Sequence, residues 1–171
     1  MKQALIKGVK SDEWYTPIET VQMMLSVFPP KVGDKILLPF DTDKSNFTKI
    51  VTRDYDPLAI YGISDFLTKE YEFDYLITNP PYSNKDEIIA RCIETGRPCV
   101  LVLPIDTLGG VQRHKLFSKT NISVYVPTKR IKFISETGEH TKSPAHHSVI
   151  MMINAPKTEI AFEYQNKGCG K

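Results

Sequence analysis

The chain has 171 residues, of which 41% are hydrophobic and 25% charged, a composition that is ordinary for a folded domain and excludes a low-complexity chain. This length predicts a single domain over 1–171, with a core at 11–153 and a C-terminal tail or edge strand at 158–171. No segment approaches the ~20 apolar residues of a membrane span, and the first ten residues contain no signal-peptide core, so we expect a cytoplasmic protein without a membrane partner.

The formal net charge of +2 is unevenly distributed along the chain. Residues 1–90 contain 10 basic and 14 acidic side chains, whereas residues 91–171 contain 12 basic and 6 acidic ones. A basic half can contact phosphates, although a solvated lysine-rich face explains the same excess equally well. The three cysteines are odd in number and lack metal-site spacing, which favours reduced thiols.

The first predicted helix follows an aromatic segment, Trp14-Tyr15-Thr16-Pro17. Thr16 suits the N-cap, Pro17 suits the first helical position, and Glu19 would complete a capping box. Apolar residues then recur at helical spacing until Pro29-Pro30 ends the helix. For Trp14, packing beneath the start of the helix is as good an explanation as a binding role.

Strands and helices are predicted to alternate along the rest of the chain. Apolar or alternating runs indicate strands at 35–38, 58–61, 73–78, 98–104, 122–126, 129–134 and 148–153, with a further edge strand at 158–163. Helices are predicted at 45–51, from a cap at Asn84 to a stop at Gly96, and at 111–119. This alternation predicts an α/β fold with a doubly wound, mostly parallel sheet.

Asn79-Pro80-Pro81-Tyr82 stands at the end of the predicted strand 73–78. The two prolines cannot donate ladder hydrogen bonds, so they stop the strand in a stiff bend at the carboxyl edge of the sheet, where α/β folds bind ligands. The Asn79 side-chain oxygen and the Pro80 carbonyl can both accept hydrogen bonds from one exocyclic amine, and Tyr82 can stack on the ring that carries it. A proline-rich surface turn is the alternative explanation.

These four residues resemble motif IV of the S-adenosylmethionine-dependent amino methyltransferases, above all the adenine-N6 DNA enzymes. Similar motifs occur in RNA adenine and guanine methyltransferases and in release-factor glutamine methyltransferases. The resemblance implies the Rossmann-like class I methyltransferase fold with a seven-stranded sheet and S-adenosylmethionine as the cofactor. It also implies a catalytic site at Asn79, Pro80, Pro81 and Tyr82.

Other segments resemble further motifs of the family in the same order. The Trp14–Pro17 stretch is similar to motif X and to the opening of small phage-type adenine methyltransferases. The cofactor-binding residues that the resemblance implies are Trp14, Tyr15, Thr16, Pro39, Phe40, Asp41, Asp65 and Phe66. The chain departs from the family where Thr42, Asp43 and Lys44 replace the expected glycine-rich turn of motif I. That turn is similar to a variant subgroup of methyltransferase-like proteins, many of them from mobile elements.

Residues 129–134 resemble motif VIII, which helps to shape the base pocket. The resemblance implies substrate contacts from Phe133, Lys129 and Arg130. The following loop, 135–147, contains three histidines at 140, 146 and 147, but no acid or cysteine at a spacing that would support a metal site. We therefore expect a loop that contacts substrate and no bound metal.

The resemblance implies transfer of a methyl group to the N6 amine of adenine in DNA, with the base flipped out of the helix. DNA is the expected partner and RNA remains open. The enzymatic alternatives are an RNA adenine or a protein glutamine methyltransferase. A different class of function is also open, in which the chain keeps the fold as a non-catalytic nucleic-acid or protein-binding module, because the motif I glycines are missing.

Overall fold

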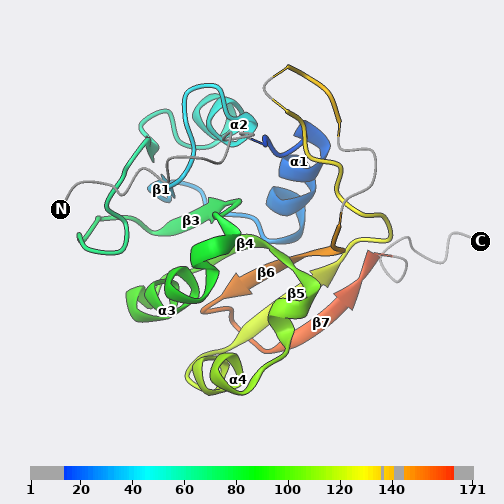
Figure 1. Ribbon diagram of the computed structural model, residues 1–171. Helices are drawn as coiled ribbons and strands as arrows, with labels where there is room; N and C mark the ends of the chain where they lie inside the picture. The colour runs from blue at the N-terminus through cyan, green and yellow to red at the C-terminus, as the bar shows by residue number, and fades with distance from the viewer. Residues whose placement is uncertain (1–13, 136, 141–144, 164–171) are drawn as a thin grey trace, which may run out of the picture.

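The computed structural model describes residues 14–135, 137–140 and 145–163 of the chain (Figure 1). Its strands form one sheet in the order β2-β1-β3-β4-β6-β5-β7. The strand bounds are β1 (Ile36–Leu38), β2 (Ile60–Tyr61), β3 (Tyr75–Thr78), β4 (Cys99–Pro104), β5 (Ile122–Val126), β6 (Ser148–Ile153) and β7 (Glu159–Phe162).

The pairing of the strands confirms the predicted doubly wound, mostly parallel sheet of seven strands. Strands β2, β1, β3 and β4 are parallel to one another. Strand β6 runs antiparallel to both of its neighbours, β4 and β5, and β7 pairs in parallel with β5. Because β1 and β3 are parallel neighbours, the residues that follow Leu38 and Thr78 emerge at the same edge of the sheet.

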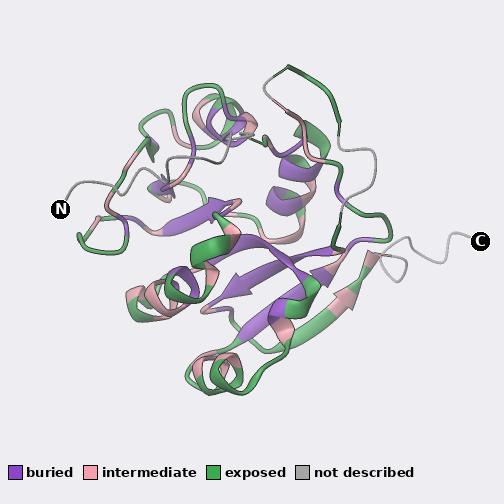
Figure 2. Cartoon of the chain, in the orientation of Figure 1, coloured by how far each residue is buried: buried purple, intermediate pink, exposed green. Residues whose placement is uncertain are grey.

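Helices cover both faces of this sheet. The helices are α1 (Ile18–Val27), α2 (Asn46–Asp54), α3 (Lys85–Thr95) and α4 (Val111–Phe117), with short 3-10 helices η1 (Tyr82–Asn84) and η2 (Ile105–Leu108). Helices α1 and α2 lie on one face, and α3 and α4 on the other (Figure 1). Successive β1 residues divide between the two cores, since Ile36 and Leu38 pack with α1 and α2 while Leu37 packs with α3. The central strands are accordingly buried on both sides, whereas the edge strands β2 and β7 are largely exposed (Figure 2).

Local sequence signals account for some of the helix ends. Helix α2 begins after Ser45, whose Oγ accepts a hydrogen bond from the Phe47 amide at 3.2 Å. Helix α3 ends at Gly96, which has a left-handed φ of 64° and is the predicted stop. Helix α3 begins at Lys85 with Asn84 in the N-cap position, but the Asn84 side chain makes no capping hydrogen bond because η1 leads directly into the helix.

The predicted capping box at the start of α1 is wrong. The helix begins at Ile18 after Pro17, and no side chain caps it. Tertiary contacts hold the preceding segment instead. Tyr15 forms backbone hydrogen bonds with Ile134, and the Asn46 side chain donates to the Thr16 carbonyl at 2.9 Å. Thr16 is therefore buried, and its hydroxyl has no partner.

The predicted strand at 129–134 is also wrong. Both edges of β5 are already occupied, by β6 on one side and by β7 on the other, so this segment has no free strand beside it. It instead crosses the carboxyl edge of the sheet, and only Ile134 makes bridge contacts, with Tyr15 and His140. The predicted edge strand in the tail is confirmed as β7. The predicted strand at 58–61 is reduced to Ile60–Tyr61.

Within the described residues, no helix is long and apolar enough to cross a membrane. The described cysteines, Cys92 and Cys99, are buried free thiols, and Cys169 lies outside the described residues. Residues 11–13 of the predicted core, residues 136 and 141–144 of the predicted loop, and the tail after 163 also lie outside them.

Candidate functional site

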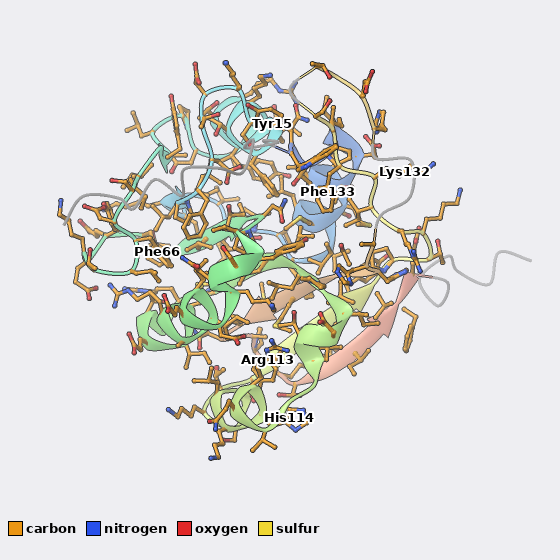
Figure 3. The ribbon with its side chains drawn as sticks, viewed as in Figure 1. Tyr15, Phe66, Arg113, His114, Lys132 and Phe133 are labelled. Carbon is orange, nitrogen blue, oxygen red and sulfur yellow. The ribbon has the colours of Figure 1, made fainter. Side chains whose placement is uncertain are left out.

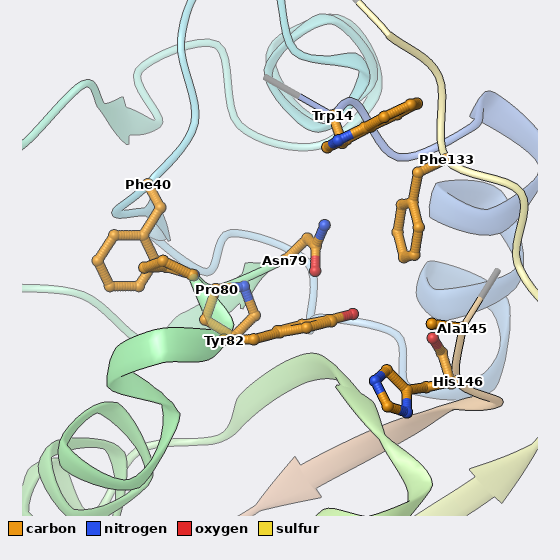
Figure 4. A pocket seen from close by; sticks show the side chains of 10 residues that line it. Trp14, Phe40, Asn79, Pro80, Tyr82, Phe133, Ala145 and His146 are labelled. Carbon is orange, nitrogen blue, oxygen red and sulfur yellow. The ribbon is translucent and has the colours of Figure 1, made fainter. Parts of the chain in front are cut away.

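A cavity of about 570 Å³ opens where β1 and β3 end (Figure 4). Its volume lies within the range of small-molecule sites, roughly 300–1,000 Å³. Five separate segments of the chain build its wall: the approach to α1, the turn after β1, the bend after β3, the segment that follows β5, and the chain around the start of β6. The lining residues are Trp14, Phe40, Asn79, Pro80, Pro81, Tyr82, Phe133, Ala145, His146 and Ser148.

Asn79 presents its amide at the centre of this cavity. The side chain points into the space between Trp14, Phe133 and Tyr82 (Figure 4). Its Oδ1 atom is buried and accepts no hydrogen bond. Leaving a buried acceptor unpaired costs about 1–3 kcal/mol, so a ligand that donates a hydrogen bond to Oδ1 would recover that free energy.

The Tyr82 ring forms a wall of the cavity directly after the two prolines. It is the first residue of η1, and this short helix fixes the direction of the ring. Its hydroxyl is buried and has no hydrogen bond of ordinary geometry. Burial raises the pKa of Tyr82 to about 12, and the nearby Ser148 hydroxyl opposes that rise. The side chain is therefore a neutral aromatic surface over the physiological pH range.

Asp41 is a buried carboxyl group directly behind the cavity wall. Its Oδ1 accepts a hydrogen bond from the Ser45 hydroxyl at 2.6 Å, and its Oδ2 accepts one from the Thr78 hydroxyl at 2.7 Å. Burial raises the pKa of Asp41 to about 6, although both hydroxyl hydrogen bonds lower it. Thr78 directly precedes Asn79. The hydrogen bond between Thr78 and Asp41 therefore links the turn after β1 to the backbone that positions the Asn79 amide.

A second, smaller cavity of about 160 Å³ adjoins the first, because Trp14, Phe40 and Asn79 line both. The remaining lining residues of the smaller cavity are Tyr15, Thr16, Asp41, Thr42 and Ser45. The Thr16 hydroxyl there is buried and unpaired, like the oxygen of Asn79. Two polar atoms without partners therefore lie at the walls of this smaller space.

The structure brings together only part of the predicted cofactor set. Trp14, Tyr15, Thr16, Phe40 and Asp41 line one or both cavities. Pro39, Asp65 and Phe66 are not among the lining residues, and their role in cofactor binding stays a prediction. Asp65 pairs with Lys69 at 2.7 Å and with the Tyr71 hydroxyl, and these partners lower its pKa. Phe66 is buried and packs edge-on against Phe40, with ring centroids 5.7 Å apart.

The predicted substrate residues are divided between two cavities. Phe133 reaches into the cavity that holds Asn79, whereas Lys129 and Arg130 line a separate groove of about 830 Å³ beside α1. Sequence reasoning missed Ser148, Ser45 and Thr78. Ser148 reaches the cavity only because β6 inserts between β4 and β5, and the hydroxyl partners of Asp41 lie up to 37 residues away in sequence.

The described histidines do not form a metal centre. Among the described residues, no group of three or more His, Cys, Asp or Glu side chains could hold a metal ion. The His147 Nε2 atom lies 2.8 Å from the Pro127 carbonyl oxygen, and the His140 Nδ1 atom lies 3.3 Å from that of Lys132. His146 lines the cavity with Asn79, and the predicted contact of its loop with substrate stays a prediction.

Comparison with known proteins gives a match in fold but none in sequence. No protein-family model matches the chain, and no curated protein matches it. A dimethyladenosine transferase from Plasmodium falciparum matches with a TM-score of 0.52 and 14% identity, over 81% of this chain and 62% of that protein. A protein described as a class I S-adenosylmethionine-dependent methyltransferase from Listeria monocytogenes matches with a TM-score of 0.53 and 15% identity, over 91% of this chain and 67% of that one.

The chain therefore spans less than two thirds of the length of the Plasmodium protein. The seven-stranded, mostly parallel sheet with its helices agrees with these matches. The protein has the Rossmann-like fold of the class I methyltransferases.

Proposed function

We propose that this protein transfers a methyl group from S-adenosylmethionine to the N6 amine of adenine in nucleic acid, with DNA as the first candidate substrate. The observation that carries the proposal is the unpaired, buried Oδ1 atom of Asn79, which points into a cavity walled by aromatic rings. An amino group on a flat ring matches both features, because it donates hydrogen bonds and offers a face for stacking.

The chemistry of an aromatic amine explains why these residue types suit the reaction. The lone pair of such an amine is delocalised into the ring, so the nitrogen is a weak nucleophile. Asn79 Oδ1 and the Pro80 carbonyl would accept the two amine hydrogens and favour a more tetrahedral nitrogen. Tyr82 and Phe133 would hold the ring by stacking, at about 1–3 kcal/mol per base. Orientation of this kind supplies much of the rate in a two-substrate transfer.

The fold family implies S-adenosylmethionine, and the residues at the smaller cavity fit the amino-acid end of this molecule. Thr16 Oγ1 and Asn79 Oδ1 are buried acceptors without partners, and the Asp41 carboxyl group lies beside them. Thr16 and Asp41 would hold the cofactor there while Asn79 Oδ1 accepts from the substrate amine, and when bound the cofactor supplies the methyl group. Because this cavity adjoins the one lined by Tyr82, the two ligands would meet at Asn79.

A second candidate function is a non-catalytic binding module that keeps the methyltransferase fold. The observation that favours it is the turn after β1, where Thr42, Asp43 and Lys44 replace glycines and both oxygens of Asp41 are already occupied by hydroxyl groups. Calorimetric titration with S-adenosylmethionine and S-adenosylhomocysteine separates the two functions. Micromolar binding supports the methyltransferase, and absence of binding to the folded protein, with nucleic acid present, supports the module.

Methyl-transfer assays on DNA, RNA and a glutamine peptide then distinguish the candidate substrates. Asn79→Ala should abolish transfer and leave the fold intact, because it removes an acceptor that has no structural partner. Asn84→Ala is the matched control. It makes the same substitution at an exposed residue whose side chain makes no capping hydrogen bond, and it should leave turnover unchanged. Normal turnover in Asn79→Ala would remove Asn79 from the site.

A further inference from the structure

Residues 128–134, which we call the rim segment, cross the carboxyl edge of the sheet directly after β5. Two of its apolar side chains point inward: Ile131 is buried in the core, and Phe133 packs against that core while lining the cavity with Asn79. Its three cationic side chains, Lys129, Arg130 and Lys132, are exposed. In Figure 3, Phe133 lies toward the centre of the molecule and Lys132 toward its outer side.

The cationic side chains of the rim segment line the groove of about 830 Å³ beside α1. His140 is a further nitrogen-bearing side chain at the groove, and Glu19 and Glu163 are its acidic ones. One Glu163 oxygen is held by the rim segment itself, since it accepts hydrogen bonds from the Thr128 amide and hydroxyl, both at 2.7 Å. Three cationic side chains and two acidic ones therefore line this groove.

Contacts with other parts of the chain hold the rim segment in place. Its last residue, Ile134, exchanges backbone hydrogen bonds with Tyr15 at 2.7 and 2.9 Å. The His140 ring lies 3.3 Å from the Lys132 carbonyl oxygen, and Ile131 is 5% exposed within the core. Because these contacts already fix the backbone, little conformational entropy of the rim segment is lost when a ligand binds.

We infer that this groove binds the phosphodiester backbone of a single strand of nucleic acid, next to the nucleotide whose base occupies the Asn79 cavity. This inference rests on the proposed function and extends it to the substrate class. Phe133 and Lys132 are consecutive residues of the rim segment, and they line the two cavities from the same stretch of backbone. A strand whose base enters the Asn79 cavity would therefore pass the rim segment, where its neighbouring phosphates can meet the cationic side chains.

A run of phosphates also explains the charge of the groove better than a protein substrate does. Glutamine in a peptide offers an amide for Asn79 but no series of negative charges for Lys129, Arg130 and Lys132. A base inside a duplex cannot enter the Asn79 cavity, whereas an unpaired or flipped nucleotide can. Single-stranded sites of this kind combine a positive groove for the backbone with aromatic rings for the bases.

The test is fluorescence anisotropy with a short labelled oligonucleotide, single-stranded DNA in one arm and single-stranded RNA in the other, without methyl donor. The rim variant combines Lys129→Ala, Arg130→Ala and Lys132→Ala. Each phosphate contact contributes about 0.7 to the slope of log affinity against log salt for a single strand, so the rim variant should lose about 2 from that slope. Raising the salt from about 50 to 200 mM weakens binding by a certain factor, and this factor should be roughly 20 times smaller for the rim variant than for the wild type.

Two further variants serve as controls. Lys31→Ala, Lys119→Ala and Lys157→Ala together remove three exposed cations that precede β1, β5 and β7, at the opposite edge of the sheet, and should leave the slope unchanged. Phe133→Ala should weaken binding without changing the slope, because it removes a ring and no charge. This contrast separates the groove from the base cavity, although Phe133 and Lys132 are adjacent in sequence.

An unchanged salt slope in the rim variant overturns the inference. An equal loss of slope in the opposite-edge variant also overturns it, and so does binding to duplexes but not to single strands. A wild-type protein that binds neither single strand overturns it regardless of any methyl transfer. If the slope falls as expected but no methyl transfer occurs, the groove stands and the proposed enzymatic function fails. The ratio of DNA to RNA affinity identifies which of the two strands the groove prefers.

Discussion

Replacing Asp41 by asparagine tests the account of the buried carboxyl group behind the cavity. Asparagine has nearly the same size and can accept one of the two hydroxyl hydrogen bonds that Asp41 now accepts from Ser45 and Thr78. The other hydroxyl can turn to accept a hydrogen bond from the new amide nitrogen. The substitution therefore removes a titratable group while largely preserving the packing.

The magnitude follows from the pKa of Asp41, which burial raises from its ordinary value of 3.8 to about 6. The folded state thus binds the Asp41 proton more tightly than the unfolded state does, so the contribution of Asp41 to stability is greatest at low pH and is lost as pH rises through about 6. A shift of this size corresponds to about 3 kcal/mol, of which about 2 kcal/mol falls between pH 4 and 7. Asp41→Asn should therefore gain about 2 kcal/mol relative to the wild type over that interval.

Urea denaturation of both proteins, at intervals from pH 4 to 8, measures this difference directly. Other carboxyl groups titrate in both proteins, so their contributions cancel in the comparison. A difference in unfolding free energy that stays constant with pH would refute the assignment of Asp41 as a buried carboxyl group with a raised pKa. A difference that grows toward low pH would show that the carboxylate, rather than the neutral acid, is the form stabilised by Ser45 and Thr78.

Three further substitutions test other parts of the structure. Tyr82→Phe should change stability by less than about 0.5 kcal/mol and retain nucleic-acid binding, because the lost hydroxyl makes no hydrogen bond; a large loss of stability in urea would contradict that geometry. Gly96→Ala should lower the free energy of unfolding by about 1 kcal/mol and Tm by roughly 3 °C in a calorimetric scan, because φ is 64° at this position. Gly109→Ala is the control, and it should be neutral or stabilising in the same scan because φ is −104° there. Tyr75→Phe removes a buried hydroxyl that donates to the carbonyl at the end of α1 at 2.5 Å, and should cost about 1–3 kcal/mol in urea unfolding; an unchanged midpoint would exclude that hydrogen bond.

Features that depend on neighbouring residues were predictable from the sequence. The apolar strand that ends at Thr78 and the bend at Asn79-Pro80 follow from the hydrophobic run and from proline stereochemistry. The stop of α3 at Gly96 follows from the conformational freedom of glycine. The α/β class follows from the alternation of these local patterns, so a cavity at the carboxyl edge of the sheet was also predictable.

Features that depend on which segments meet were decided only by the tertiary structure. Alternating side chains mark the buried face of an extended segment but carry no information about which strand edge is free for hydrogen bonding. Residues 129–134 and the tail both alternate, yet β7 pairs with β5 while the rim segment crosses the edge of the sheet. Thr16 has the sequence signature of a helix cap. In the structure it is buried, because Tyr15 pairs with Ile134 and the Asn46 side chain donates a hydrogen bond to the Thr16 carbonyl. The partners of Asp41 and the division of the rim segment between two cavities arise for the same reason: each joins residues whose proximity is set by the packing of the whole sheet rather than by their spacing in the chain.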